Sequence, residues 1–219
     1  MGEKILIVGG VAGGASTAAR LRRMNEKAEI IILEKGEHIS FANCGMPYYI
    51  GGVIEEREKL LVQTPEAMKA RFNIDVRINN EVIDIDRDSR EIKIRDIKEN
   101  NIYKESYDKL VLSPGADPVK PPLEGLEAEN VFTLRNIPDT DKIKEYIDNK
   151  KPETAVVVGG GFIGLEMVEN LKEQGIEVSQ VEMLDQVMNQ LDYEMAAMIH
   201  NHLRAQGVNL YLNNGLEKV

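Results

Sequence analysis

The chain has 219 residues, of which 42% are hydrophobic and 29% charged, so it can bury the core of one large domain or two modest ones. Its net charge of −10 is spread along the sequence without a basic stripe, which argues against nucleic acid and anionic membranes as partners. No apolar run reaches the roughly 18 residues of a membrane span, and the N-terminus lacks a signal-peptide layout. The single cysteine rules out an internal disulfide. We therefore expect a soluble, cytoplasmic protein.

The N-terminal residues are expected to form a strand, a glycine turn, a helix and a second strand. A short run rich in β-branched residues covers 4–8, helix-forming residues occupy 15–24, and an apolar run at 29–33 ends at Glu34. Strand, glycine turn, helix, strand and acid follow one another in this order in a mononucleotide-binding half. The segment therefore predicts one half of a dinucleotide-binding fold.

The middle of the chain is expected to hold a loop, two helices and a small antiparallel sheet. Residues 37–52 have a loop-like composition with a short helix starting near Cys44, and Thr64 is placed to cap a helix that begins at Pro65. Turn residues separate four runs of alternating apolar positions, which predict an antiparallel meander: 74–78, 81–87, 91–96 and 102–106. A buried strand is expected at 110–112.

A second glycine-marked unit follows a stiff connector at 118–122. A helix is expected first at 139–147, with Asp139 or Thr140 as its cap. The N-terminal pattern then recurs and is followed by one more helix and strand: 154–158, 159–164, a helix to Gln174, 177–181 with Glu182, 192–205 and 209–212. A doubly wound sheet usually has more strands than this, so we expect the second unit to be incomplete.

The sequence thus predicts an α/β fold with two Rossmann-like three-layer units, the second incomplete, and a small antiparallel β-meander in the first. We expect a nucleotide-binding domain at residues 1–117, a connector at 118–150 and a second nucleotide-binding domain at 151–219.

The glycine turns are candidate nucleotide sites. A glycine turn between strand and helix allows backbone N–H groups and the helix N-terminus to face a pyrophosphate. Gly159, Gly161 and Gly164 match the dinucleotide fingerprint fully. The alternative is that such a turn serves only the packing of helix against sheet.

The first turn departs from that fingerprint. Val11 stands where the middle glycine belongs, between Gly9 and Gly14. Close approach to phosphates must then depend on Gly10, Ala12 and Gly13. Glu34 at the following strand end favours nucleotide binding, because a carboxylate there can accept the hydroxyls of a ribose.

Glu182 holds the same place in the second unit. An acid at this position repels a 2′-phosphate and therefore favours NADH over NADPH. Met183, rather than an arginine, follows it, which points the same way.

Cys44 is the candidate redox residue. A lone cysteine is most often an inert buried hydrophobe, and that alternative stays open. Asn43 and Gly45 flank the thiol at a predicted helix start, where a helix N-terminus stabilises the thiolate that attacks disulfides. Because the chain has no second cysteine, the sulfur partner must be external: a small thiol, a persulfide or a peroxide oxygen.

Other charged residues give weaker signals. Arg20 and Arg23 share a face of the first helix, with Ser16 one turn earlier, and this face is either solvated surface or a phosphate clamp for an anionic thiol ligand. His200 and His202 point to different sides of a predicted helix, and we expect both at the surface. No metal-ligand spacing is present.

Together these residues resemble the single-cysteine branch of the flavoprotein disulfide reductases, most closely the coenzyme A-disulfide reductases. The shared stretches run through the chain in family order: 9–14, 41–44 with Pro47 and Tyr48, 106–110, 113–116, 132–136 and 159–164. The Cys44 segment is the specific signal, since glycine turns alone indicate only a nucleotide-binding flavoprotein. Family members continue well past this length, so the resemblance covers their N-terminal portion.

The resemblance implies FAD in the first domain and NAD(P)H in the second. Glu34 would contact the adenosine ribose, Phe162 would cover the flavin until the nucleotide enters, and Glu166 would lie near the nicotinamide. The implied cofactor-binding residues are Gly9, Gly10, Val11, Ala12, Gly13, Gly14, Glu34, Lys35, Ser113, Pro114, Gly115 and Ala116 for FAD, and Gly159, Gly160, Gly161, Phe162, Ile163, Gly164, Glu166 and Glu182 for NAD(P)H.

The resemblance also implies a reaction. Cys44 would be the catalytic nucleophile, with hydride passing from NAD(P)H to FAD and two electrons passing on to a mixed disulfide between Cys44 and coenzyme A. The implied substrate-binding residues are Ser16, Arg20, Arg23, Ser40, Asn43 and Arg71, of which Asn43 also belongs to the catalytic pair with Cys44. A homodimer is implied for a full-length relative.

Two alternatives remain. Related NADH oxidases and peroxidases cycle a cysteine between thiolate and sulfenic acid and carry a histidine in the first glycine turn, where this chain has Ala12. That difference favours reduction of CoA disulfide, or of a related persulfide or polysulfide, over reduction of oxygen or peroxide. The other alternative is a non-catalytic nucleotide-binding fragment.

Overall fold

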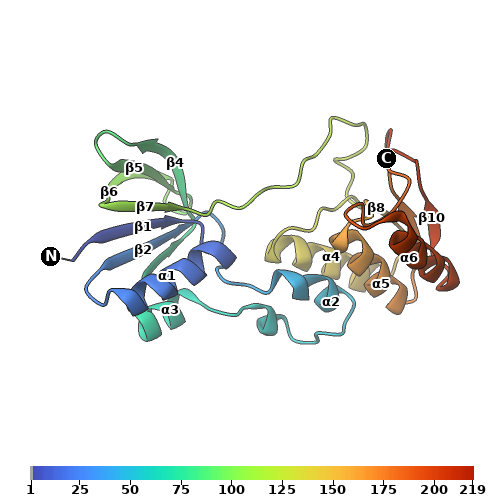
Figure 1. Ribbon diagram of the computed structural model, residues 1–219, viewed down its shortest axis with the longest axis horizontal. Helices are drawn as coiled ribbons and strands as arrows, with labels where there is room; N and C mark the ends of the chain where they lie inside the picture. The colour runs from blue at the N-terminus through green and yellow to red at the C-terminus, as the bar shows by residue number, and fades with distance from the viewer. Residues whose placement is uncertain (1) are drawn as a thin grey trace. The chain divides into compact units, whose positions relative to one another are not determined.

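The computed structural model describes residues 2–219, which form two compact units of helices and strands (Figure 1). The first unit contains the described residues up to Ala42 together with Glu58–Ala116, and the second contains Asn43–Arg57 and Asp117–Val219. The chain therefore leaves the first unit at residue 43, contributes a short segment to the second, and returns at residue 58. The predicted α/β class is confirmed.

The first unit is built on a parallel sheet with the strand order β3-β2-β1-β7. Its elements are β1 (Lys4–Val8), α1 (Ala12–Met24), β2 (Glu29–Glu34), α3 (Pro65–Phe72), β3 (Asp75–Ile78) and β7 (Lys109–Leu112). Side chains alternate across a strand, so Ile5 and Ile7 of β1 pack in one core with Ala18 of α1 and Met68 of α3. Leu6, between them, enters a second core on the other face.

An antiparallel sheet covers that second face (Figure 1). It contains β4 (Asn80–Asp86), β5 (Glu91–Asp96) and β6 (Asn101–Ser106), in that order. Ile92 and Ile94 of β5 are buried against Leu6 and its neighbours on β2. The predicted meander is confirmed for three of its four runs, but the prediction for 74–78 is wrong.

That run forms β3, which pairs in parallel with β2 at the edge of the first sheet. Alternating apolar residues mark a strand but do not identify the strand beside it. The boundary between the two sheets lies at Asn79, whose left-handed backbone (φ 57°) separates β3 from β4.

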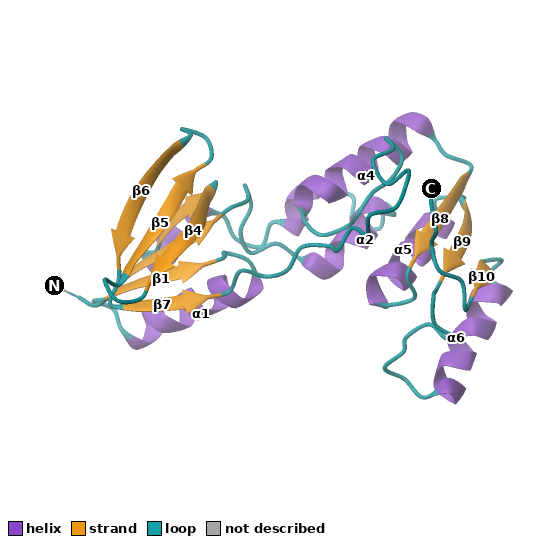
Figure 2. Ribbon diagram, turned by 90° about the horizontal axis from the view of Figure 1, so that it is seen from above, coloured by secondary structure: helices purple, strands orange, loops and turns teal. Residues whose placement is uncertain are grey.

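The second unit is built on a smaller parallel sheet with the order β10-β9-β8, shown side by side in Figure 2. Its elements are η1 (Asn43–Gly45), α2 (Met46–Ile50), η2 (Arg57–Leu60, shared with the first unit), α4 (Ile137–Lys150), β8 (Thr154–Val158), α5 (Phe162–Glu173), β9 (Glu177–Val181), α6 (Tyr193–Ala205) and β10 (Asn209–Tyr211). The recurrence of strand, glycine turn, helix and strand is therefore present in both units.

Helix α4 begins earlier than predicted. Its cap is Asn136, whose side-chain oxygen accepts a hydrogen bond of 2.9 Å from the backbone N–H of Asp139. The expected caps, Asp139 and Thr140, lie inside the first turn instead. Asparagine is as good an N-cap residue as aspartate. A proline at the start of a helix is tolerated because a backbone N–H there has no acceptor within the helix.

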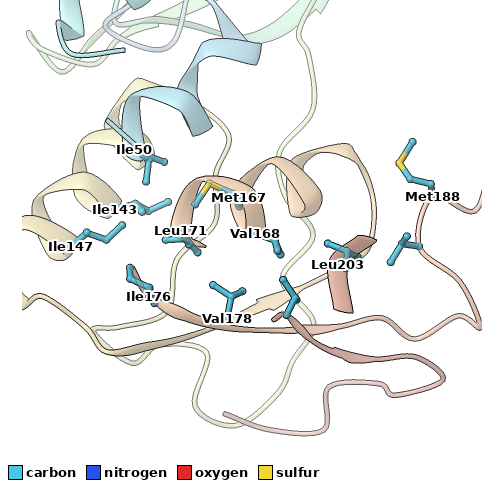
Figure 3. Packing of buried hydrophobic residues seen from close by; sticks show 12 residues of the cluster. Ile50, Ile143, Ile147, Met167, Val168, Leu171, Ile176, Val178, Met188 and Leu203 are labelled. Carbon is cyan, nitrogen blue, oxygen red and sulfur yellow. The ribbon is translucent and has the colours of Figure 1, made fainter. Parts of the chain in front are cut away.

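The core of the second unit joins α2, α4, α5 and the sheet. Ile50 of α2 is fully buried beside Ile143 and Ile147 of α4 and Leu171 of α5 (Figure 3). The sequence division placed α2 in the first domain and α4 in the connector, so the compact units differ from that division in both segments. The assignment of a cofactor to each domain stays a prediction.

Candidate functional site

The two glycine turns have the same hydrogen-bond geometry. In the first, Glu34 Oε2 accepts from the N–H of Gly10 at 2.7 Å and its Oε1 accepts from the N–H of Gly36 at 2.8 Å. In the second, Glu182 Oε2 accepts from the N–H of Gly160 at 2.6 Å, and its Oε1 accepts from the N–H of Leu184 at 2.8 Å. Each strand-end carboxylate therefore fixes the second peptide of its own turn. Each oxygen keeps a further lone pair for another donor.

The outer glycines of each turn are required by the fold itself. Gly9 and Gly159 have φ values of +92° and +108°, which only glycine adopts readily. A Cβ on Gly14 would overlap the carbonyl oxygen of Gly9 and lie 2.9 Å from its carbon. A Cβ on Gly164 would meet Gly159 in the same way, at 3.1 Å from the carbon. These four positions would be glycine with or without a ligand.

The middle position of the second turn is different. Gly161 has an ordinary φ of −81°, and a Cβ placed on it would meet nothing within 4 Å. Neither backbone conformation nor packing requires glycine here. Close approach of a ligand to the backbone at this point would account for it. In the first turn Val11 occupies this position and is half-buried.

Both turns lead into helices whose first N–H groups are open to a ligand. Val11 and Gly161 are the N-cap residues of α1 and α5, and neither cap makes a side-chain hydrogen bond. The first turn of each helix also contains no acidic residue. The helix dipole and the free donors therefore face outward, as an anion such as a pyrophosphate needs.

Residues after β7 close over the first turn. A Cβ on Gly9 would overlap the carbonyl oxygen of Ser113, and one on Gly13 would lie 3.3 Å from Ser113 Oγ. Ser113 also donates its N–H to the carbonyl of Val8 at 2.8 Å. The structure thus brings Ser113 beside the first turn, as a shared cofactor site needs. Pro114, Gly115 and Ala116 follow it as an exposed segment.

Cys44 is exposed, so the inert buried cysteine is not what this structure contains. It lies in η1, directly before α2, which is a helix of only five residues. Asn43 is half-buried beside it. Both residues belong to the second unit.

The segment that carries Cys44 is anchored to the second unit at three places. Ile50 is fully buried in the core there. Gly51 packs directly on Asn170 of α5, and its carbonyl accepts a hydrogen bond from Gln174 Nε2. At the far end, Arg57 and Asp141 of α4 form a two-pronged ion pair with distances of 2.8 and 2.7 Å.

Tyr48 lies one helical turn after Cys44. Glu169 of α5 raises the pKa of the Tyr48 phenol above its usual value, with further contributions from burial, from Glu166 and from Cys44. The phenol therefore stays protonated and can donate a hydrogen bond near the thiol. The sequence analysis named Tyr48 only within a stretch shared with the family and gave it no role, because Glu169 is more than a hundred residues away along the chain.

The predicted substrate-binding residues belong mainly to the first unit. Ser16, Arg20 and Arg23 are exposed on α1, and Arg71 is exposed on α3 with its guanidinium 5.1 Å from the ring of Phe72. Ser40 lies at the first glycine turn, where its N–H donates to the carbonyl of Gly10 at 3.0 Å. Arg22, which lies between Arg20 and Arg23 in the sequence, has a structural role instead.

That arginine, Arg22, donates to the carbonyl of Ala28 at 2.7 Å and to that of Phe72 at 2.8 Å. It fixes the end of α1 to the end of α3. Since Arg22 is committed to backbone carbonyls, Arg20 and Arg23 are the arginines of α1 that remain exposed.

The remaining predicted residues of the second turn are accessible. Phe162 and Ile163 are 62% and 57% exposed at the start of α5. Glu166 is half-buried one turn further on. Lys35 is exposed after Glu34.

None of the helices among residues 2–219 has the length and apolar character of a membrane span.

The prediction for His200 is wrong. Its side chain is 3% exposed, and its Nε2 accepts a hydrogen bond of 3.1 Å from the N–H of Val187. His202, on the opposite side of α6, is exposed as expected. The helix has one buried stripe, and spacing alone did not identify which of the two histidines it contains.

The family follows from comparison with known proteins. Residues 3–219 match the family described as pyridine nucleotide-disulphide oxidoreductase, and the chain belongs to this family. It is 38% identical over 217 residues to the coenzyme A disulfide reductase of Staphylococcus haemolyticus (strain JCSC1435), with 99% of this chain and 49% of that protein covered. The chain thus spans about half the length of the curated relatives it matches.

Solved structures give the same result. Reduced CoADR-RHD of Bacillus anthracis superposes with a TM-score of 0.96 at 58% identity, over 100% of this chain and 39% of that one. A NAD-dependent persulfide reductase from A. fulgidus has a TM-score of 0.94 at 39% identity, over 99% of this chain and 41% of that one. The resemblance inferred from the Cys44 segment and the glycine turns is confirmed.

Proposed function

We propose that this chain carries the nucleotide-binding and thiol-bearing part of an FAD-dependent oxidoreductase, which uses NAD(P)H to reduce CoA disulfide or a related persulfide or polysulfide through Cys44. The observation that carries the proposal is the repeated glycine turn, held by Glu34 in one unit and Glu182 in the other. The relatives named for coenzyme A disulfide and persulfide reduction support the substrate class. A cytoplasmic location and a homodimer of the full-length protein belong to the same proposal.

The residues of the first turn fit the pyrophosphate of FAD. The N–H groups at the start of α1 are open, small residues line the approach, and Ser113 lies within reach of the turn. The lone pairs left on Glu34 suit the hydroxyls of a ribose. When bound, FAD would supply the conversion of a hydride from NAD(P)H into the two electrons that cleave a disulfide.

Cys44 supplies the sulfur chemistry. Its thiolate attacks one sulfur of the oxidised substrate, the substrate S–S bond breaks, and a mixed disulfide forms while one thiolate leaves and takes up a proton. Two electrons then cleave the mixed disulfide, which releases the second thiol and restores the Cys44 thiolate. The protonated phenol of Tyr48 is a hydrogen-bond donor for the sulfur anion, and its ionised form is disfavoured by Glu169.

The second turn favours NADH in this proposal. Both carboxylate oxygens of Glu182 are held by backbone N–H groups, so its negative charge is fixed at the end of β9, and an acid at such a strand end repels a 2′-phosphate. The following residue, Met183, is 71% exposed and offers no positive charge in return. Coulomb repulsion therefore selects against NADPH.

Mass spectrometry of the chain after treatment with CoA disulfide tests the proposal. We expect a single coenzyme A adduct with release of one equivalent of coenzyme A, and Cys44→Ser should abolish it. Because Cys44 is the only cysteine, any disulfide adduct reports on this residue. Failure to form the adduct, together with a lasting sulfenate after peroxide treatment, would favour an oxidase or peroxidase. Absence of both would leave a nucleotide-binding fragment. Flavin absorbance after incubation with FAD tests the first turn separately.

A further inference from the structure

His200 connects α6 to the loop that follows β9. Its ring nitrogen Nε2 accepts a hydrogen bond of 3.1 Å from the backbone N–H of Val187, and both residues are buried. Since Nε2 is the acceptor, the proton of the neutral ring lies on Nδ1. The bond exists only while the ring is neutral, because a charged imidazolium has donors at both nitrogens.

The residues next to that bond hold the second glycine turn. Val187 packs on Gly160 so closely that a Cβ on the glycine would lie 2.8 Å from Val187 Cγ1. Met188 donates its N–H to the carbonyl of Gly160 at 2.8 Å, while the N–H of Gly160 is held by Glu182. The loop and the strand-end acid therefore hold both backbone polar groups of Gly160.

We infer that neutral His200 is a positioning residue for the nucleotide site. The neutral ring acts as a latch that holds the loop at 183–188 against Gly160, and protonation of the ring loosens the second glycine turn. This inference rests on the proposed function, in which that turn binds the nicotinamide nucleotide. His200 acts through Val187 and does not itself lie in the turn.

The surroundings of the ring favour its neutral form, so protonation needs a lower pH than for an ordinary histidine. Burial lowers the pKa of His200, Arg204 on the same helix lowers it further, and Asp185 on the loop opposes them. Tyr193, a further titratable neighbour, places its ring edge-on to His200 with the ring centroids 6.2 Å apart. At neutral pH the ring is therefore neutral and the latch is closed. Protonation replaces the acceptor by a donor that faces the N–H of Val187, and the loop must move.

Affinity for ADP-ribose, measured by calorimetry on this chain, tests the inference. ADP-ribose carries the part of the nucleotide that a glycine turn holds, cannot reduce a flavin, and keeps its pyrophosphate charge across the range. For the wild type we expect affinity to fall roughly tenfold between about pH 8 and about pH 5. In His200→Gln, whose amide oxygen can accept from Val187 without titrating, the change should stay below about twofold.

His202→Gln is the matched control, because it removes a histidine of the same helix that is exposed. It should keep the pH dependence of the wild type. Equal pH dependence in the wild type and His200→Gln would overturn the inference.

Hydrogen exchange without ligand separates this inference from the proposed function. In the wild type, after correction for the intrinsic pH effect, amides of 183–191 should lose protection as the pH falls, and this needs no variant to fold. Exchange that does not depend on pH refutes the latch. Acid-sensitive exchange combined with no ADP-ribose binding at either pH refutes the nucleotide function, and with it the role of His200 in that function, but not the latch itself.

Discussion

Replacement of Gly51 by alanine should destabilise the second unit and the segment that carries Cys44. Gly51 has an ordinary helical backbone (φ −71°, ψ −9°), so alanine costs nothing in conformation there. The added Cβ, however, would lie 2.7 Å from Asn170 Cβ and 2.8 Å from Asn170 Cγ, with the amide oxygen closer still. Ordinary contact begins at 3.4 Å, so relief of the contact with Asn170 Cβ alone requires the two segments to separate by about 0.7 Å.

The neighbour cannot yield easily. Asn170 is 1% exposed, and its side-chain nitrogen donates to the carbonyl of Glu166 at 2.8 Å. Overpacking of this kind in a close-packed interior costs about 1–3 kcal/mol. The same separation would also stretch the hydrogen bond from Gln174 to the Gly51 carbonyl. We therefore expect Gly51→Ala to lower the free energy of unfolding of the second unit by about 2 kcal/mol.

Hydrogen exchange on peptides of α5 and β9 measures that free energy separately from the first unit. Asn170→Ala introduced with Gly51→Ala should restore part of the loss but not all of it, since it removes the amide oxygen and Cγ that the new methyl group meets and leaves the Cβ at 2.7 Å. Gly161→Ala is the control, because its added Cβ meets nothing within 4 Å. If Gly51→Ala is as stable as Gly161→Ala, the close packing of the Cys44 segment on α5 is wrong.

Three further predictions address the turns, the anchor and the first unit. Gly161→Ala should keep wild-type stability but weaken ADP-ribose binding by about tenfold or more. Gly164→Ala should lose stability as well as binding. Equal loss of stability in the two variants would contradict the idea that Gly161 is glycine because of a ligand. Asp141→Asn should lower the unfolding free energy by less than about 1 kcal/mol, because both partners are partly exposed, yet raise the rate at which Cys44 reacts with an aromatic disulfide; an unchanged rate would show that Arg57 is not needed as an anchor. Burial alone would raise the pKa of Glu105, but hydrogen bonds from Lys4 and Arg77 bring it below its usual value, so its contribution to stability is present at neutral pH and is lost on acidification. Glu105→Gln should thus be less stable than the wild type at neutral pH, and it should lose less stability on acidification. Hydrogen exchange on peptides of β6 measures both quantities, and a parallel fall of stability with pH in the two proteins would refute the prediction.

The local patterns of this sequence predicted most of the helices and strands and the order in which they follow one another. The two glycine turns, the acids at the ends of β2 and β9, and the cap at Thr64, whose hydroxyl accepts from Ala67 at 3.2 Å, depend on residues within a few positions of one another. Glu34 and Glu182 were expected at strand ends facing a ribose. Their additional bonds to Gly10 and Gly160 follow from the same placement.

The features that the sequence analysis missed depend on distant partners. The contact between Gly51 and Asn170 joins residues far apart in the chain, and nothing in the spacing of either segment indicates it. An apolar residue such as Ile50 predicts burial but not in which core it is buried. His200 was expected at the surface because its partner is a backbone N–H, which leaves no mark in a sequence. A strand such as β3 likewise shows its own alternation without showing its neighbour.

The excursion at 43–57 limits how this fold can be divided or recombined. The polypeptide crosses between its units at residues 42/43, 57/58 and 116/117, so no single junction separates them. A chimaera that exchanges only residues 117–219 with a homologue would join the borrowed α4 and α5 to a native Ile50, Gly51 and Arg57. The segment that carries Cys44 must therefore coevolve with α4 and α5, which are encoded far downstream. A fusion at the connector 118–122 should therefore disturb Cys44, even though Cys44 lies outside the exchanged residues.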